Sequence, residues 1–192
     1  MRHSLLSKAL HALLALSITH QLLISLVMEE PHPPRRPIET AFQLHAWVGV
    51  VSFGVIIAVW IWTLVRRSEA GVGAFVPWFS AARRRAVIDD LRAYAVALPR
   101  LQLPDSTAHS AFANAVHGLG LLLATYLAAT GFAVYMQMAA DGSMTRLGHM
   151  LADWHGALAN VMWAYLIGHA AMALLHQVMG EGLLRKMWTI RG

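Results

Sequence analysis

Residues 153–177 read DWHGALANVMWAYLIGHAAMALLHQ. The stretch is apolar enough to cross a lipid bilayer, but it holds three histidines, His155, His169 and His176. A buried imidazole without a partner is costly in hydrocarbon, so a histidine inside a membrane helix indicates a functional site. We therefore expect this stretch to form the helix that carries the chemistry of the protein.

The composition of the whole chain agrees with a membrane location. Of its 192 residues, 57% are hydrophobic and 13% are charged, which is more apolar than an ordinary soluble domain. The net charge of +5 does not indicate nucleic acid, because the basic residues lie beside apolar segments, where membrane orientation explains them. The chain has no cysteine, which excludes disulfides, iron–sulfur ligation and covalently attached c-type haem.

Four segments reach the roughly 20 apolar residues that a membrane helix needs. Only helices satisfy their own backbone over such runs in lipid, so we expect an all-α, four-transmembrane-helix bundle that forms one domain over residues 1–192. The first segment begins like a signal peptide, but no small-x-small cleavage site follows, and we interpret it as an uncleaved helix. The predicted membrane helices are about 9–28, 42–65, 114–137 and 154–179, and the long loop is 66–113.

The distribution of lysine and arginine predicts the orientation of this bundle. Of the 15 basic residues, 12 lie in the N-terminal region, the long loop and the C-terminal tail. The two short links, which end before the second and fourth predicted helices, hold only Arg35, Arg36 and Arg146. The positive-inside rule therefore places both termini and the long loop in the cytoplasm, in a multi-pass protein of the bacterial inner membrane.

The long loop contains one further predicted helix. Its stretch PWFSAARRRAVIDDLRAYAVALP, residues 77–99, places apolar residues at helical spacing and ends at Pro99. Three consecutive arginines, at 83–85, follow Trp78 and Phe79 closely. This pattern is typical of an interfacial helix on anionic lipid, and the alternative is a docking surface for a cytoplasmic partner.

The spacing of His155 and His169 indicates two cofactors and not one metal ion. The two residues are 14 positions apart. At 100° per residue they share one face of a helix, separated by about 21 Å along its axis. A single metal ion cannot use both, because its ligands must converge within a few ångströms. The spacing suits a helix that supplies one axial ligand to each of two haems stacked across the membrane.

Each haem then needs a second imidazole from another helix at a matching depth. With the N-terminus inside, His45 at the outer start of the second helix pairs with His155, and His11 at the inner start of the first helix pairs with His169. The inner depth match is imperfect, because His169 lies about 15 Å from the end of its helix. His176 therefore competes with His169, and His20 competes less well with His11.

The remaining histidines have simpler interpretations. His117 lies early in the third predicted helix, where it hydrogen-bonds a haem propionate or a quinone, or is an ordinary interfacial histidine. Solvated surface is the expectation for the others, with His149 placed in the short link 138–153. These others are His3, His32, His109 and His149.

Small residues lie near the candidate ligands. A flat macrocycle needs helices that lack bulk at its level, although small residues also mediate ordinary helix packing in membranes. The glycines concerned are Gly49, Gly118, Gly120, Gly131, Gly156 and Gly168.

These residues together resemble a known family. KALHALLAL, QLHAWVGV, the H-x13-H spacing followed by H-x-V, and the basic ending GLLRKMW occur in this order. With FANAVHGLGLLLATYLAATGF they resemble the bacterial cytochrome b561 and nickel-iron hydrogenase cytochrome b-subunit superfamily. The resemblance covers nearly the whole chain and implies a bundle of four or five helices that binds two b-type haems and exchanges electrons with quinone. It places the haem ligands on His11, His45, His155 and His169.

The sequence therefore favours a dihaem b-type membrane cytochrome that transfers electrons between the quinone pool, as ubiquinone or menaquinone, and a redox partner. The resemblance implies a hydrogenase, another dehydrogenase or a soluble cytochrome as that partner. Haem propionates need cationic partners, for which Arg35 and Arg36 are candidates on the outer face.

Two alternatives remain open at the level of sequence. The first is a superoxide oxidase that reduces quinone, with Arg35 and Arg36 attracting the anion, although three glutamates in the same link offset their charge. The second is a haem-free transporter or membrane scaffold whose histidines move protons or metal ions. It would need acidic or other polar groups inside the membrane helices, and no Asp, Glu, Lys or Arg occupies a helix centre.

Overall fold

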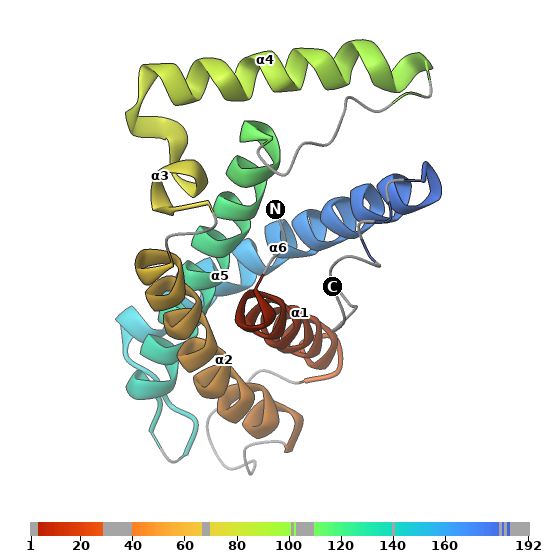
Figure 1. The fold of residues 1–192 in the computed structure, drawn as a ribbon. Helices are drawn as coiled ribbons and strands as arrows, with labels where there is room; N and C mark the ends of the chain where they lie inside the picture. The colour runs from red at the N-terminus through yellow and green to blue at the C-terminus, as the bar shows by residue number, and fades with distance from the viewer. Residues whose placement is uncertain are drawn as a thin grey trace. The chain divides into compact units, whose positions relative to one another are not determined.

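The computed structural model describes residues 4–28, 40–66, 70–100, 102, 110–139, 141–180, 182 and 184. The described chain is all-α, as predicted, and has no named strand; one isolated bridge joins Met138 and Met144. Figure 1 shows the helices in chain order. They are α1 (Leu5–Ile24), α2 (Thr40–Val65), α3 (Val72–Phe75), α4 (Ala81–Ala97), α5 (Ala111–Gln137) and α6 (Arg146–Val178), with short 3-10 helices η1 (Pro77–Phe79) and η2 (Leu98–Arg100).

Among the described residues, three helices are long and apolar enough to cross a membrane: α2, α5 and α6. Their hydropathy is high because each contains a long run of aliphatic and aromatic residues. The backbone hydrogen bonds of such a run are satisfied within the helix itself. The helix α1 has 20 residues and includes Lys8, two histidines and Gln21. It does not reach the same apolar threshold, so the fourth span stays a prediction.

The start of α6 differs from the prediction. The helix begins at Arg146 and not near residue 154, so the link 138–153 is shorter than expected and His149 lies inside the helix. The cause is a local cap: the Gly148 N–H donates to Thr145 Oγ1 at 3.1 Å, which satisfies a backbone donor of the first turn. Arg146, His149 and Asp153 interrupt the apolar pattern of residues 146–153, so hydropathy does not mark this part of the helix.

The chain forms two compact units. One contains residues 9–59 and 123–165, and it carries most of α1 and α2 with the adjoining parts of α5 and α6. Aromatic contacts join its helices, with ring centroids 5.8 Å apart for Phe53 and Phe132 and 6.3 Å apart for Trp47 and Tyr135. Met162 is its most deeply buried large side chain. This unit therefore has its own apolar core.

The other unit contains residues 1–8, 60–122 and 166–192. In it, Trp62 Nε1 donates to Ser7 Oγ at 2.8 Å and so connects α2 with the start of α1. The glycine at 118 permits a close approach, because a Cβ there would lie 1.8 Å from the carbonyl oxygen of Phe75. This glycine therefore serves helix packing against α3.

The predicted loop helix is present as α4, and it is fixed to the start of α5. Asp90 Oδ2 accepts hydrogen bonds from Ser110 Oγ at 3.0 Å and from the Phe112 backbone N–H at 3.1 Å. Ser110 Oγ in turn accepts from the Ala113 N–H, which is the usual N-cap bond. In Figure 1 the start of α5 accordingly lies next to α4.

Candidate functional site

The structure brings His45 of α2 and His155 of α6 together in one compact unit. Their ring centroids are 6.2 Å apart and the ring planes are nearly perpendicular, at 88°. These two residues were predicted to lie at the same depth in the membrane. The arrangement brings two imidazoles from different helices into an edge-to-face pair.

The orientation of His155 is set by α5. Thr130 Oγ1 lies 3.1 Å from His155 Nδ1, and the same hydroxyl lies within hydrogen-bond distance of the Tyr126 and Leu127 carbonyl oxygens. Because a hydroxyl has one proton and carbonyls only accept, Thr130 donates to the backbone and accepts from the His155 Nδ1–H. The lone pair of the imidazole is then on Nε2, which is the tautomer of a metal ligand with a supporting hydrogen bond.

A glycine leaves room for the His155 ring. An added Cβ at Gly131 would lie 3.0 Å from His155 Cε1. Contacts this short force a neighbour to move, so a larger residue at this position would displace the ring. By contrast, an added Cβ at Gly156 or Gly168 meets nothing within 4 Å. Of the glycines beside His155, Gly131 is therefore the one whose small size the ring requires.

The other imidazole of the pair, His45, is approached by α1. Gln21 Nε2 donates to the His45 carbonyl oxygen at 3.0 Å, and an added Cβ at Gly49 would lie 3.0 Å from that same Nε2. Nδ1 of His45 and Nδ1 of His20 are buried, and neither has a hydrogen-bond partner among the described residues. Buried imidazole nitrogens without a partner indicate a group that binds there.

A second pair of histidines lies in the other unit. His117 of α5 and His169 of α6 have ring centroids 5.1 Å apart, with an angle of 82° between their planes. The His117 Nδ1–H donates to the Ala113 carbonyl oxygen at 2.7 Å, which fixes the lone pair on its Nε2. Since His11 belongs to the other unit, its predicted pairing with His169 stays a prediction.

The competitor for His169 has a different neighbour. His176 is 6% exposed and Tyr94 of α4 is 8% exposed. Tyr94 Oη and His176 Nε2 are 3.5 Å apart, and the ring centroids are 6.2 Å apart. In this structure His176 therefore takes part in attaching α4 to the end of α6.

Several residues named from the sequence lie outside the described part of the chain. They are Arg35, Arg36, His3, His32 and His109. Other contributors were not found by sequence reasoning, namely Thr130, Gln21 and Tyr94. Thr130 gave a weak signal, because it is a polar residue within an apolar span directly before Gly131.

The fold and this site define a class: a membrane protein of apolar helices in which imidazoles from different helices lie in pairs. A family model described as prokaryotic cytochrome b561 matches residues 2–190, and the chain belongs to this family, as its sequence motifs indicated. Membership implies a membrane b-type cytochrome that binds haem b and takes part in electron transfer. No curated protein and no solved structure matches the chain.

The residues around His45 and His155 fit a haem. Two imidazoles on opposite sides of one iron have ring centroids about 6 Å apart, for metal–nitrogen bonds of about 2 Å. The observed separation is 6.2 Å. In the part of the chain that the structure describes, no three His, Cys, Asp or Glu side chains converge as ligands for a bare metal ion. Two histidines suit an iron whose other four ligands come from a macrocycle.

The separation of the ring centroids also distinguishes the pair His117 and His169 from the pair His45 and His155. The 5.1 Å between His117 and His169 is shorter than two opposite ligands of one iron require. The two rings are therefore in edge-to-face contact, and His117 is a neighbour of His169 rather than its opposite ligand.

Proposed function

We propose that the protein is a dihaem membrane cytochrome that transfers electrons between the quinone pool and a redox partner. The observation that carries this proposal is the separation of His45 and His155, which suits bis-histidine ligation, in a chain of the cytochrome b561 family. A haem iron held by two imidazoles has no open position and exchanges single electrons. The protein would then be an electron carrier and not a bond-making catalyst.

The residues of the first site have separate roles in this proposal. His45 and His155 hold the cofactor, Thr130 accepts the His155 Nδ1–H and fixes its tautomer, and Gly131 leaves space for the ring. The apolar residues of α2, α5 and α6 exclude water, and this low-polarity environment tunes the reduction potential.

We further propose that His11 and His169 hold the second haem. The H-x13-H spacing supports this choice because it places His155 and His169 on one face of α6 at two depths. The contact of His176 with Tyr94 gives the competing histidine a packing role. We assign His117, which touches His169, to a hydrogen bond with a quinone or a haem propionate.

The proposed arrangement in the membrane follows the sequence. We propose that α1 is a fourth membrane helix, that both termini and the segment between α2 and α5 are cytoplasmic, and that the membrane is the bacterial inner membrane. This orientation places His45 near the outer face, and it makes Arg35 and Arg36 candidates for propionate binding there. The excess of basic residues on one side supports it.

The test is a haem count on the purified protein by the pyridine haemochrome method, with a reduced-minus-oxidised spectrum. We expect two b-type haems per chain, and one in either His45→Ala or His155→Ala. His149→Ala is the matched control, because His149 is an exposed histidine on the same helix as His155. A haem-free protein from haem-replete cells would contradict the proposal.

The second site and the quinone are tested separately. Loss of one haem in His11→Ala and in His169→Ala, with no loss in His176→Ala, is the expected result. His117→Ala should retain both haems and be reduced more slowly by a soluble quinol, while dithionite reduces it fully. Reduction by quinol at the rate of the unmodified protein would remove His117 from the quinone site.

A further inference from the structure

The helix α4 lies at the level where two membrane helices end. Its Tyr94 has ring contacts with Phe112, the second residue of α5, and with His176, near the last residue of α6, at 5.7 and 6.2 Å between centroids. Its Asp90 binds the first turn of α5. Since α5 and α6 are long enough to cross the bilayer, their shared end lies near the boundary between hydrocarbon and headgroups.

Only a narrow stripe of α4 packs against the rest of the unit. Val87, Asp90, Tyr94 and Ala97 follow one another by three or four residues, and they are the less exposed positions of the helix. The other side chains are exposed, including Ile88 at 47%. A helix at the membrane boundary therefore presents most of its surface to whatever surrounds the protein.

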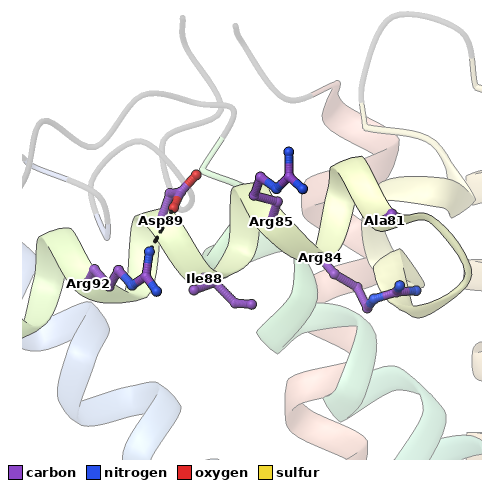
Figure 2. Close-up of a pocket in the computed structure, with 6 residues that line it drawn as sticks. All are labelled: Ala81, Arg84, Arg85, Ile88, Asp89 and Arg92. Atoms are coloured by element: carbon purple, nitrogen blue, oxygen red, sulfur yellow. Dashed lines mark ion pairs between the residues drawn. The ribbon is translucent and has the colours of Figure 1, made fainter.

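One part of this surface is basic, and we call it the arginine face. The residues of this face line an open hollow of about 390 Å³ along the helix. In Figure 2 the side chains of Arg84 and Arg92 lie on either side of Ile88. The lining residues are Ala81, Arg84, Arg85, Ile88, Asp89 and Arg92.

Two of the three arginines of this face have polar partners, but these partners do not neutralise the face. Arg84 Nη1 donates to the Trp78 carbonyl oxygen, which carries no charge. Arg92 Nη1 is 3.5 Å from Asp89 Oδ1, and both side chains are largely exposed, so this ion pair is weak. Arg85 has no ion pair among the described residues. With three arginines and one aspartate, the face has a net positive charge.

The chemistry of the face matches a phosphate group. Guanidinium groups bind phosphate oxygens in pairs of parallel hydrogen bonds. Arg84 and Arg92 are eight residues apart, about 12 Å along the helix, so they would serve two separate phosphates. Exposed apolar side chains accompany the cations, with Phe79 92% exposed just before the helix. Cations beside exposed aromatic and aliphatic residues are typical of a surface that lies on anionic lipid.

We propose that the arginine face of α4 binds the phosphate headgroups of anionic phospholipids, with Phe79 and Ile88 in contact with the acyl boundary. The binding fixes α4 on the membrane surface at the shared end of α5 and α6. It is independent of the haems, because none of its residues belongs to the histidine pairs.

The experiment compares the whole protein in nanodiscs of phosphatidylcholine with and without phosphatidylglycerol, using hydrogen–deuterium exchange of the backbone amides of residues 81–97. We expect phosphatidylglycerol to slow this exchange. The slowing reports binding of phosphatidylglycerol to the arginine face. We expect this binding to weaken about fivefold in Arg84→Gln, and about fivefold again when Arg92→Gln is added.

The controls distinguish lipid binding by the arginine face from a general effect of charge, from binding of free phosphate and from binding of a soluble partner. Arg100→Gln with Arg146→Gln removes the same charge from exposed sites outside the face, and it should leave the slowing unchanged. Inorganic phosphate added to phosphatidylcholine discs should not reproduce it, because a lipid must present the phosphate at the surface. Equal exchange of α4 in both discs would overturn the proposal and favour a soluble acidic partner. Unchanged haem content shows that each variant is folded.

Discussion

At the scale of single residues, the tautomer of His155 on α6 depends on its hydrogen bond with Thr130 on α5. The Thr130 hydroxyl donates to its own backbone, which leaves its lone pairs for the His155 Nδ1–H. A threonine within a membrane helix often only bonds the preceding turn. Here the same bond prepares the oxygen to act as an acceptor for a neighbouring imidazole.

We expect Thr130→Val, which keeps the shape of the side chain and removes the oxygen, to weaken haem binding at the first site about tenfold. The loss follows because the His155 Nδ1–H loses the Thr130 oxygen as an acceptor and the ring is less firmly oriented. Competition for haem with apomyoglobin measures the affinity. Thr130→Ser retains the hydroxyl and should bind haem like the unmodified protein, and equal affinity in the valine variant would disprove the role.

The pair Gly131 and Gly156 gives a second prediction. Gly131→Ala places a Cβ 3.0 Å from His155 Cε1, so the ring must move or the helices must separate. We expect a loss of stability of about 1–3 kcal/mol and an altered haem spectrum. Gly156→Ala, which meets nothing within 4 Å, should leave the spectrum unchanged. Identical spectra and melting temperatures in the two variants would contradict this account.

Sequence reasoning reached some of these residues and not others, for physical reasons. His45 and His155 could be paired because helix direction and depth follow from topology. The contact between His117 and His169 could not, since it depends on the rotation of α5 about its axis. The roles of Gln21 and Thr130 depend on side-chain bonds between helices that no periodic pattern records.

At the scale of elements, hydropathy marks the apolar length of a helix, whereas capping residues mark where the helix begins. The helices α2 and α5 were predicted within three residues at each end, because apolar composition marks their whole length. The first eight residues of α6 were missed because Thr145 and local bonds begin that helix where polar residues interrupt the apolar pattern. Capping residues are the signal that would have found it.

The turn between α5 and α6 gives a prediction on pH. Asp141 Oδ1 accepts from Ser143 Oγ at 2.6 Å and from the Ser143 N–H at 3.0 Å, and these bonds lower the pKa of the Asp141 carboxyl below its usual 3.8. A lowered pKa means that the carboxylate stabilises the turn above the unfolded pKa and that this contribution is lost as pH falls through the folded value.

Titration of the carboxyl carbon by NMR measures this pKa directly. We expect Ser143→Ala to raise it toward 3.8, because the larger of the two effects comes from the hydroxyl. Ser25→Ala removes a hydroxyl far along the chain and should not change it. A pKa of Asp141 that is the same with and without Ser143 would show that the turn bonds do not form in solution.

At the scale of the whole molecule, the membrane helices contain few buried residues. The most apolar windows of α2, α5 and α6 have 17%, 22% and 6% of their residues buried. Large side chains such as Val51, Ile61 and Leu64 of α2 are exposed. Lipid covers such surfaces, and a bound cofactor adds contacts to the helices that hold it.

Removal of haem should therefore destabilise the protein as a whole. A ligand present at about 1,000 times its Kd stabilises the folded state by about 4 kcal/mol. We expect protein produced under haem depletion to melt at a lower temperature than the loaded protein, and added haem to restore the melting temperature. A melting temperature that is independent of haem would mean that the helices are held together without it.

The first histidine pair also imposes an order on biosynthesis. His45 emerges from the ribosome more than a hundred residues before His155, and Thr130 of α5 emerges in between. A nascent chain that has inserted only its first membrane helices holds one imidazole of the pair and lacks the helix that completes it. On the ligation proposed here, cofactor loading at this pair follows insertion of α6, and a chain that stops before α6 reaches the membrane with only His45 of the pair.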